Sequence, residues 1–163
     1  MNNLEHIVKG FITQLLQESA ATELVVSFSG GMDSMALFEL VSIIAPQIDV
    51  GCRALHIDHG LSEESKHTSL ECEKFARAKR VPIEIIRIYD KPNSGDSVES
   101  WAREQRYNSI SRRIDKNCLV LTAHHLDDQV ETILQRILSG SGPHGLRGML
   151  PLRKLYPGFL GRP

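Results

Sequence analysis

Apolar and polar residues follow one another along the chain in blocks that predict helices and strands in turn. Between Leu4 and Leu16, apolar residues recur every three or four positions, which predicts an amphipathic helix of about four turns. Short apolar, β-prone runs predict strands at residues 24–28, 50–58, 82–88 and 118–123. Between and after these runs, we expect helices at residues 35–44, 62–79, 97–114 and 127–138. From Ser139 onward glycine and proline recur, and no regular structure is predicted.

This alternation of strands and helices predicts parallel βαβ units with right-handed crossovers. The expected fold class is α/β: an open, Rossmann-like parallel sheet of four to five strands with helices on both faces. Such sheets bind ligands beyond the carboxyl ends of their strands, where the strand order reverses. A length of 163 residues suits one domain covering residues 1–163. Because each polar motif below follows a strand or begins the next helix, we expect a single site.

The end of the first strand has the character of an anion-binding turn. It stops at Ser29, Gly30 and Gly31, and a helix begins near Asp33 and Ser34. Paired glycines permit positive φ and close approach of a ligand. Their amides, the two serine hydroxyls and the positive end of the helix would cradle phosphate oxygens. No Gly-Lys-Ser/Thr follows, unlike the other common phosphate loop. The alternative is a plain turn with Asp33 as helix cap.

Two further segments bring polar side chains near strand ends. His56 and Asp58 finish the second strand, where they would lie beside a nucleotide, although for this motif alone a solvated turn after a buried strand is the commoner explanation. Glu99, Arg103 and Arg106 are spaced four and three residues apart and share one helix face. Arginine grips phosphate through two N–H groups, while a solvated ladder of ion pairs is the alternative.

The run after the fourth strand is the most specific, with five ionisable groups: His124, His125, Asp127, Asp128 and Glu131. Asp128 and Glu131 lie one helical turn apart and face the same way. Paired carboxylates can hold Mg²⁺ or an ammonium group such as that of lysine. The two histidines raise a transition metal as an alternative, but no third well-spaced ligand accompanies them. The glycine-rich residues 139–149 are either a flexible helix exit or a loop that lies over the phosphates.

Charge and cysteine usage narrow the class of protein. The formal net charge of −1 gives no overall attraction for nucleic acid, so RNA would need a local patch or further chain. Four basic residues form either such a patch or a solvated rim: Arg53, Arg77, Lys79 and Arg80. The three cysteines have neither zinc nor redox spacing, so we expect free thiols at Cys52, Cys72 and Cys118. With no signal peptide or long apolar run, we expect a cytoplasmic protein without a membrane anchor.

Five segments, in this order, resemble the N-terminal catalytic domain of tRNA(Ile)-lysidine synthetases, which are N-type ATP pyrophosphatases. They are SGGMDS, HIDHGL, ExxARxxRY, TAHHLDDQVET and GSGPHGLRGM, within about residues 24–151. The resemblance implies a fold of the adenine nucleotide alpha-hydrolase type. It also implies that ATP adenylates a cytidine in the CAU anticodon of tRNA(Ile) with loss of pyrophosphate, after which free L-lysine displaces AMP to form lysidine.

Joined with the residue chemistry, this resemblance gives the hypothesis of a two-step ligase that uses ATP and Mg²⁺. The expected nucleotide contacts are Ser29, Gly30, Gly31, Met32, Asp33, Ser34, His56 and Asp58. The expected catalytic residues are Asp33, Asp127, Asp128, Arg103 and Arg106, of which the three aspartates would hold Mg²⁺ and one arginine the α-phosphate. The expected lysine site is Asp128, Glu131, His124 and His125, with one histidine as proton acceptor.

Two other functions remain open. One is another adenylating ATP pyrophosphatase, for tRNA thiolation or small-molecule amidation, although thiolating enzymes usually carry cysteine pairs that are absent here. The other is an ATP-binding module without activity of its own, because family members continue into C-terminal domains that hold tRNA. Residues 158–163 resemble the opening of a further family motif, so the chain is either shortened or a natural short form. The oligomeric state, including a homodimer, is left open.

Overall fold

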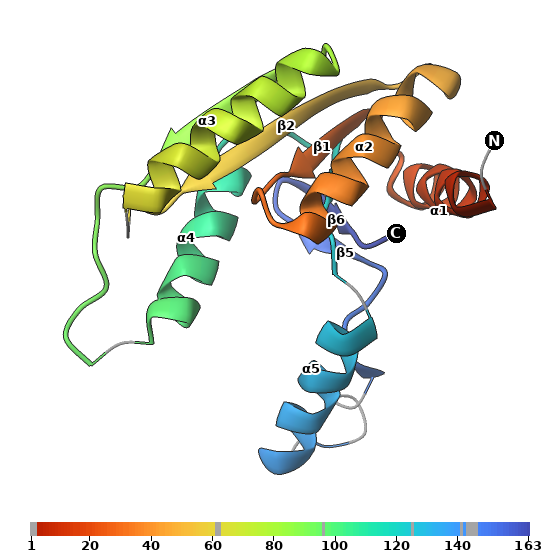
Figure 1. Ribbon diagram of the computed structural model, residues 1–163. Coiled ribbons are helices and arrows are strands. Elements are labelled where there is room, and N and C mark those ends of the chain that lie inside the picture. The colour runs from red at the N-terminus through yellow and green to blue at the C-terminus, as the bar shows by residue number, and fades with distance from the viewer. Residues whose placement is uncertain (1–2, 61–62, 96, 125, 141, 143–146) are drawn as a thin grey trace.

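The computed structural model describes residues 3–60, 63–95, 97–124, 126–140, 142 and 147–163 (Figure 1). Its helices are α1 (Asn3–Ser19), α2 (Met32–Gln47), α3 (Glu63–Ala78), α4 (Val98–Ser111) and α5 (Leu126–Leu138). Its strands are β1 (Glu23–Ser27), β2 (Gly51–Asp58), β3 (Ile83–Arg87), β4 (Cys118–Leu121), β5 (Leu152–Leu155) and β6 (Gly158–Gly161). Every helix and strand predicted from the periodicity is therefore present. The predicted first residue of the third helix, Ser62, lies outside the described residues.

The strands form one sheet in the order β3-β2-β1-β4-β6-β5. β1 pairs in parallel with β2 and β4, β3 with β2, and β6 with β4, whereas β5 runs antiparallel to β6. The predicted α/β class is thus confirmed. The predicted number of strands, four to five, was too low, because β5 and β6 lie where no regular structure was expected. Two of the four residues of β6 are glycines, which are depleted in strands and conceal it in the sequence.

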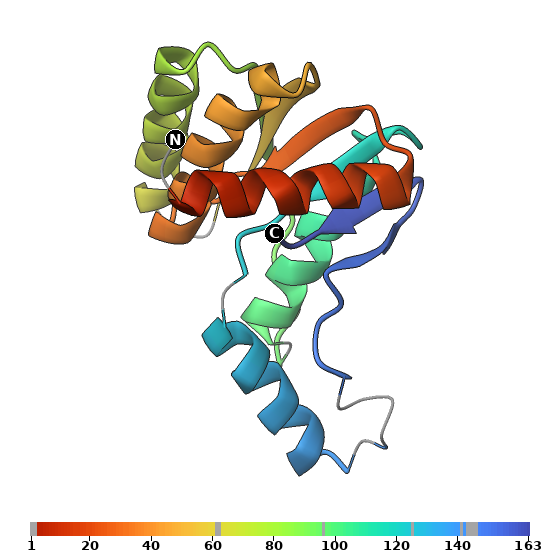
Figure 2. The same ribbon diagram turned by 90° about the vertical axis from the view of Figure 1, so that its right-hand side faces the viewer.

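Successive residues of the central strands point to opposite faces of the sheet and build two cores. On β1, Leu24 and Val26 belong to the core covered by α1, α2 and α3, whereas Val25 belongs to the core on the α4 side. The second core is closed by Ile110 and Ile114, at and just after the end of α4. Helices therefore cover both faces, as predicted, and the arrangement is visible in Figures 1 and 2.

Helix α5 differs from the others because it extends away from the sheet, as both views show (Figure 2). Three of its apolar side chains, Val130, Leu134 and Ile137, are about half exposed. The helix is fastened instead to the segment that returns to β5. The Gln129 side chain donates to the Met149 carbonyl at 3.0 Å and accepts from its amide, and Arg136 Nη1 donates to the Gly148 carbonyl at 2.8 Å.

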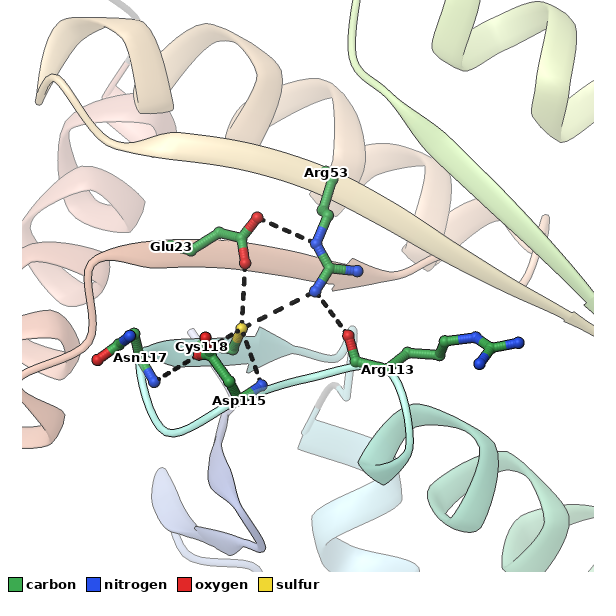
Figure 3. Close-up of polar contacts among 6 residues, drawn as sticks. All are labelled: Glu23, Arg53, Arg113, Asp115, Asn117 and Cys118. Carbon is green, nitrogen blue, oxygen red and sulfur yellow. Dashed lines mark hydrogen bonds and ion pairs between the residues drawn. The ribbon is translucent and has the colours of Figure 1, made fainter.

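A polar network ties together the amino-terminal ends of β1, β2 and β4 (Figure 3). Arg53 Nε donates to Glu23 Oε1 at 3.0 Å, and its Nη2 donates to the Arg113 carbonyl at 2.8 Å. The Cys118 Sγ lies 3.1 Å from Glu23 Oε2 and 3.4 Å from Asp115 Oδ1, and its single proton is donated to one of these two acceptors. Arg53 is therefore engaged at the edge of the sheet opposite to the carboxyl ends of the strands.

Two more of the four basic residues that were expected to form a patch or a solvated rim make ion pairs, one on α3 and one directly after it. Arg77 pairs with Glu73 at 3.2 Å, and Lys79 pairs with Glu39 at 2.6 Å. Arg53 lies at the edge of the sheet opposite to the carboxyl ends of the strands. Together with the two ion pairs, this position favours the solvated rim over an RNA-binding patch. The predicted free thiols are confirmed for all three cysteines. Within the described residues, no helix has the length and apolar character needed to cross a membrane.

Candidate active site

A small cavity of about 120 Å³ opens at the carboxyl ends of β1 and β4. The chain leaves β1 towards β2 and β3 on one side and returns at β4 on the other, so the strand order reverses between β1 and β4. Open parallel sheets bind ligands at such a switch point. The cavity is lined by Ser27, Ser29, Gly31, Asp33, Ser34, Arg106, Tyr107, Thr122, Ala123 and His124. Three sequence motifs that lie far apart in the chain thus line one cavity.

The glycine turn after β1 is held by its own serines. Ser29 Oγ donates to Ser34 Oγ at 2.9 Å, and Ser34 Oγ donates to the Gly31 carbonyl at 2.9 Å. Gly30 has a φ of +85°, and a Cβ there would lie 2.5 Å from Thr68 Cγ2 on α3. The two hydroxyls that were expected to contact phosphate therefore contact each other and fix the shape of the turn.

Helix α2 starts directly from this turn, with Gly31 at its N-cap and no side-chain cap. Asp33 lies inside the first turn of the helix, so the alternative that it serves as the cap is not what the structure contains. The first amides of a helix have no intrahelical acceptor and carry the positive end of its dipole. A helix start of this kind has the donors and the charge that suit an anion. Met32, the first residue of α2, is 87% exposed.

Helix α4 supplies the arginines. Ser97 begins the helix as its N-cap, where its side chain accepts from the Ser100 amide at 3.3 Å, as predicted. Arg106 is half-buried and lines the same cavity as Asp33. Arg103 is exposed and lines a neighbouring, larger cavity. Tyr107 lines both cavities and separates the surroundings of the two arginines.

His124 enters the cavity just after β4. Its Nδ1 lies 2.9 Å from the hydroxyl of Thr122, which is itself buried. Burial lowers the pKa of His124 to about 4, assisted by the positive charges of Arg162, Arg103 and Arg106, while Asp128 acts in the opposite direction. The ring is therefore neutral at neutral pH, and Asp128 is near enough to influence it.

The three carboxylates of the segment that follows β4 differ in their exposure to solvent. Asp128 is half-buried, whereas Asp127 and Glu131 are exposed on α5. His125 lies outside the described residues, as do residues 141 and 143–146 of the glycine-rich loop. Within the described residues, no group of three or more histidine, cysteine or acidic side chains is placed to hold a metal ion.

His56 and Asp58 are buried at the end of β2. His56 Nδ1 lies 2.7 Å from the Phe28 carbonyl and its Nε2 lies 3.1 Å from Ser69 Oγ, so both nitrogens contact the protein. Burial lowers the pKa of His56. Burial would raise the pKa of Asp58, but hydrogen bonds from the Gly60 amide and Ser65 reverse the shift and lower it. His56 thus braces the chain just before the glycine turn, whereas Asp58 holds the turn that follows β2.

Comparison with known protein families identifies the domain that contains this cavity. A family model described as a PP-loop domain (ATP_bind_3) matches residues 4–163. The chain belongs to the PP-loop family of ATP-binding domains. The glycine turn at residues 29–34 lies within the matched domain.

Curated relatives of this PP-loop domain confirm the resemblance found in the sequence. Proteins named tRNA(Ile)-lysidine synthase from Vibrio parahaemolyticus and Vibrio atlanticus are 39% identical over 87% of the chain and 35% identical over 98% of it. One from Chromobacterium violaceum is 41% identical over 83% of the chain. The PP-loop domain spans 32%, 35% and 31% of the lengths of these relatives, about a third of each.

Two solved structures share the fold of this PP-loop domain. A U34-tRNA thiolase from Methanococcus maripaludis has a TM-score of 0.63 at 16% identity, over 82% of this chain and 52% of its own. An NH₃-dependent NAD synthetase from Campylobacter jejuni has a TM-score of 0.58 at 18% identity, over 87% of this chain and 62% of its own. At such identities the likeness concerns the fold alone.

Three residues near the glycine turn received no role from the sequence, although they belong to segments noted there: Tyr107, Thr122 and Arg162. Thr122 could have been found, because a polar residue ending an apolar strand marks the ligand edge of a parallel sheet. Arg162 follows β6, and its position at this edge depends on a strand that the sequence concealed. Its Nη1 donates to the Leu150 carbonyl at 2.6 Å, and burial lowers its pKa.

Proposed function

We propose that this PP-loop domain is the catalytic part of a tRNA(Ile)-lysidine synthetase. It would adenylate a cytidine in the CAU anticodon of tRNA(Ile) and join L-lysine to it, releasing pyrophosphate and then AMP. The observation that carries the proposal is the shared cavity of Asp33, Arg106 and His124 at the switch point of the sheet. Relatives with this name at 35–41% identity support it. Since ATP and tRNA are its substrates, the proposed reaction is cytoplasmic.

The phosphate loop and Arg106 would hold ATP. The open amides at the start of α2 and the turn at Gly30 and Gly31 suit the β- and γ-phosphates, which leave together as pyrophosphate. Arg106 lines the same cavity as this turn, whereas Arg103 lines the adjacent one. We therefore assign the α-phosphate to Arg106. His56 would position the turn through the Phe28 carbonyl rather than contact the nucleotide.

Asp33, with Asp127 or Asp128, would hold Mg²⁺. This ion commonly takes only one or two carboxylates from a protein and completes its shell with phosphate oxygens and water. The arrangement suits such a donor set, because Asp33 lines the phosphate cavity while Asp128 acts on His124 in the same cavity. Bound there, Mg²⁺ would offset negative charge on the departing pyrophosphate.

Asp128 and Glu131 would bind the ε-ammonium group of lysine, one helical turn apart on α5. The amine must lose a proton before it displaces AMP. His124 is unprotonated at neutral pH, but a pKa of about 4 makes its ring a weak base, so the charge of Asp128, which acts to raise this pKa, would have to support the role. His125 is the second histidine proposed for this role.

The first test removes the charge of Asp33 without changing its size. Asp33→Asn should lower pyrophosphate release in the presence of ATP, lysine and isoleucine tRNA by roughly a hundredfold or more, because electrostatic stabilisation of the leaving group is lost. Asp49→Asn is the matched control, since Asp49 is exposed in the turn after α2 with a φ of 54°, which asparagine accepts. Unchanged turnover in Asp33→Asn would contradict the assignment.

The same assay separates the other functions. Release of AMP that does not depend on lysine would indicate another adenylating PP-loop enzyme. Binding of ATP in a calorimeter without any product, even after the C-terminal part of a relative is added, would indicate a nucleotide-binding module. The proposed enzyme requires both lysine dependence and product.

A further inference from the structure

A second cavity, of about 630 Å³, lies between α4, α5 and the segment that leads into β5. Five arginines line it: Arg103, Arg136, Arg147, Arg153 and Arg162. Of the described residues that line it, none is acidic. The chain as a whole has 19 basic and 20 acidic residues, so this concentration of positive charge is local.

Three of these guanidinium groups contact neutral partners among the described residues: Arg103, Arg153 and Arg162. Arg153 and Arg103 lie over the Tyr107 ring, 5.0 and 5.5 Å from its centroid. Arg162 donates to the Leu150 carbonyl, and its Nε is buried without a hydrogen-bond partner among the described residues. A buried donor without an acceptor is costly unless a ligand supplies one.

The position of the cavity indicates what the ligand is. Tyr107 lines both this cavity and the one at the phosphate loop, so the two are neighbours. The smaller cavity, of about 120 Å³, has no room for a polynucleotide beside the reacting groups. The remainder of an RNA substrate must therefore lie next to it. Arginine pairs with phosphate through two parallel hydrogen bonds, and phosphate contacts position a nucleic acid.

We propose that the five-arginine cavity holds the phosphodiester backbone of the RNA next to the nucleotide that is modified, so that the RNA enters between α4 and α5. This inference rests on the proposed function, from which it takes RNA as the substrate. It supplies the local basic patch that the net charge of the chain requires. The proposal assigns the two sources of phosphate to different cavities: ATP to the cavity at the glycine turn, and the RNA backbone to the cavity on the other side of Tyr107.

The test is the salt dependence of binding to a labelled anticodon stem-loop of isoleucine tRNA. Arg147→Gln combined with Arg153→Gln should reduce the slope of log K against log salt by about 1.4, since each phosphate contact contributes about 0.7 for single strands. At about 0.1 M salt this corresponds to roughly 25-fold weaker binding. The affinity for ATP should stay unchanged.

Arg77→Gln with Lys79→Gln is the matched control, because it removes the same charge from ion-paired residues on α3 and directly after it. It should leave the slope unchanged. If loss of Arg153 from the Tyr107 ring prevents folding, Arg147→Gln alone tests the proposal, since Arg147 is exposed. Three results would overturn it: no binding of the stem-loop by the parent chain at low salt, an unchanged slope in the arginine variants, or an equal loss of ATP affinity. Failure of the proposed function would show differently, as absence of lysine-dependent product.

Discussion

At Gly30 the backbone has a φ of +85°, and Thr68 Cγ2 occupies the space 2.5 Å from where a Cβ would be. The glycine pair was evident in the sequence, and its chemistry predicted the turn. The contact with Thr68 was not evident, because it depends on how α3 packs against β2 and the turn. The sequence therefore predicted why a glycine is permitted here, whereas only the structure shows why one is required.

We expect Gly30→Ala to lower the free energy of unfolding by about 1–3 kcal/mol, through both the strained φ and the clash. Adding Thr68→Ser removes Cγ2 and should restore part of this loss, since only the backbone strain and a 3.1 Å approach to Cys72 remain. Chemical denaturation of the single and double variants measures the difference. Equal stabilities of the two would show that Thr68 does not constrain this position.

At the scale of elements, α5 and the segment 147–150 form one unit through Gln129 and Arg136. Periodicity predicted α5 itself, because its apolar and charged residues alternate at helical spacing. It could not predict that α5 leaves the sheet, since an apolar helix face indicates burial without naming its partner. Strand β5 escaped prediction because two of its four residues, Arg153 and Lys154, are charged, and β6 because it contains Gly158 and Gly161.

Gln129→Ala should release Met149 from α5. Its side chain bonds both the amide and the carbonyl of Met149, and loss of about 1 kcal/mol would speed exchange of the Met149 amide by roughly fivefold to tenfold. Gln135→Ala is the control on the same helix, because Gln135 is exposed and its contact with Glu131 spans 3.5 Å. Hydrogen exchange by mass spectrometry distinguishes the two. Equal protection of Met149 in both variants would mean that the contact does not fasten the segment.

For the whole molecule, three histidines near the strand ends share one electrostatic property. Burial lowers the pKa of His56, His59 and His124, in the last case to about 4. Between about pH 4 and 6.5 the unfolded chain therefore binds more protons than the folded chain, so the free energy of unfolding rises with pH. The stability that these neutral rings contribute is complete above the ordinary histidine pKa and is lost as the solution becomes more acidic.

We predict that the free energy of unfolding is lower at about pH 5 than at about pH 7, by on the order of 1 kcal/mol after allowance for solvent screening. His124→Gln should reduce this difference, because it removes the group with the largest shift. His6→Gln, at an exposed position of α1, should leave it unchanged. Denaturation curves at the two pH values measure the effect, and a higher stability at the acidic pH would refute it.

The buried thiols have a practical consequence. Burial raises the pKa of Cys52 to about 12 and those of Cys72 and Cys118 to about 11, so at neutral pH the described chain offers alkylating reagents almost no native thiolate. Met32, by contrast, projects into solvent from the first turn of α2, where the helix dipole favours a thiolate. A single cysteine introduced at this position would carry a fluorophore beside the proposed nucleotide site, with almost no labelling of the native cysteines and without loss of a core residue.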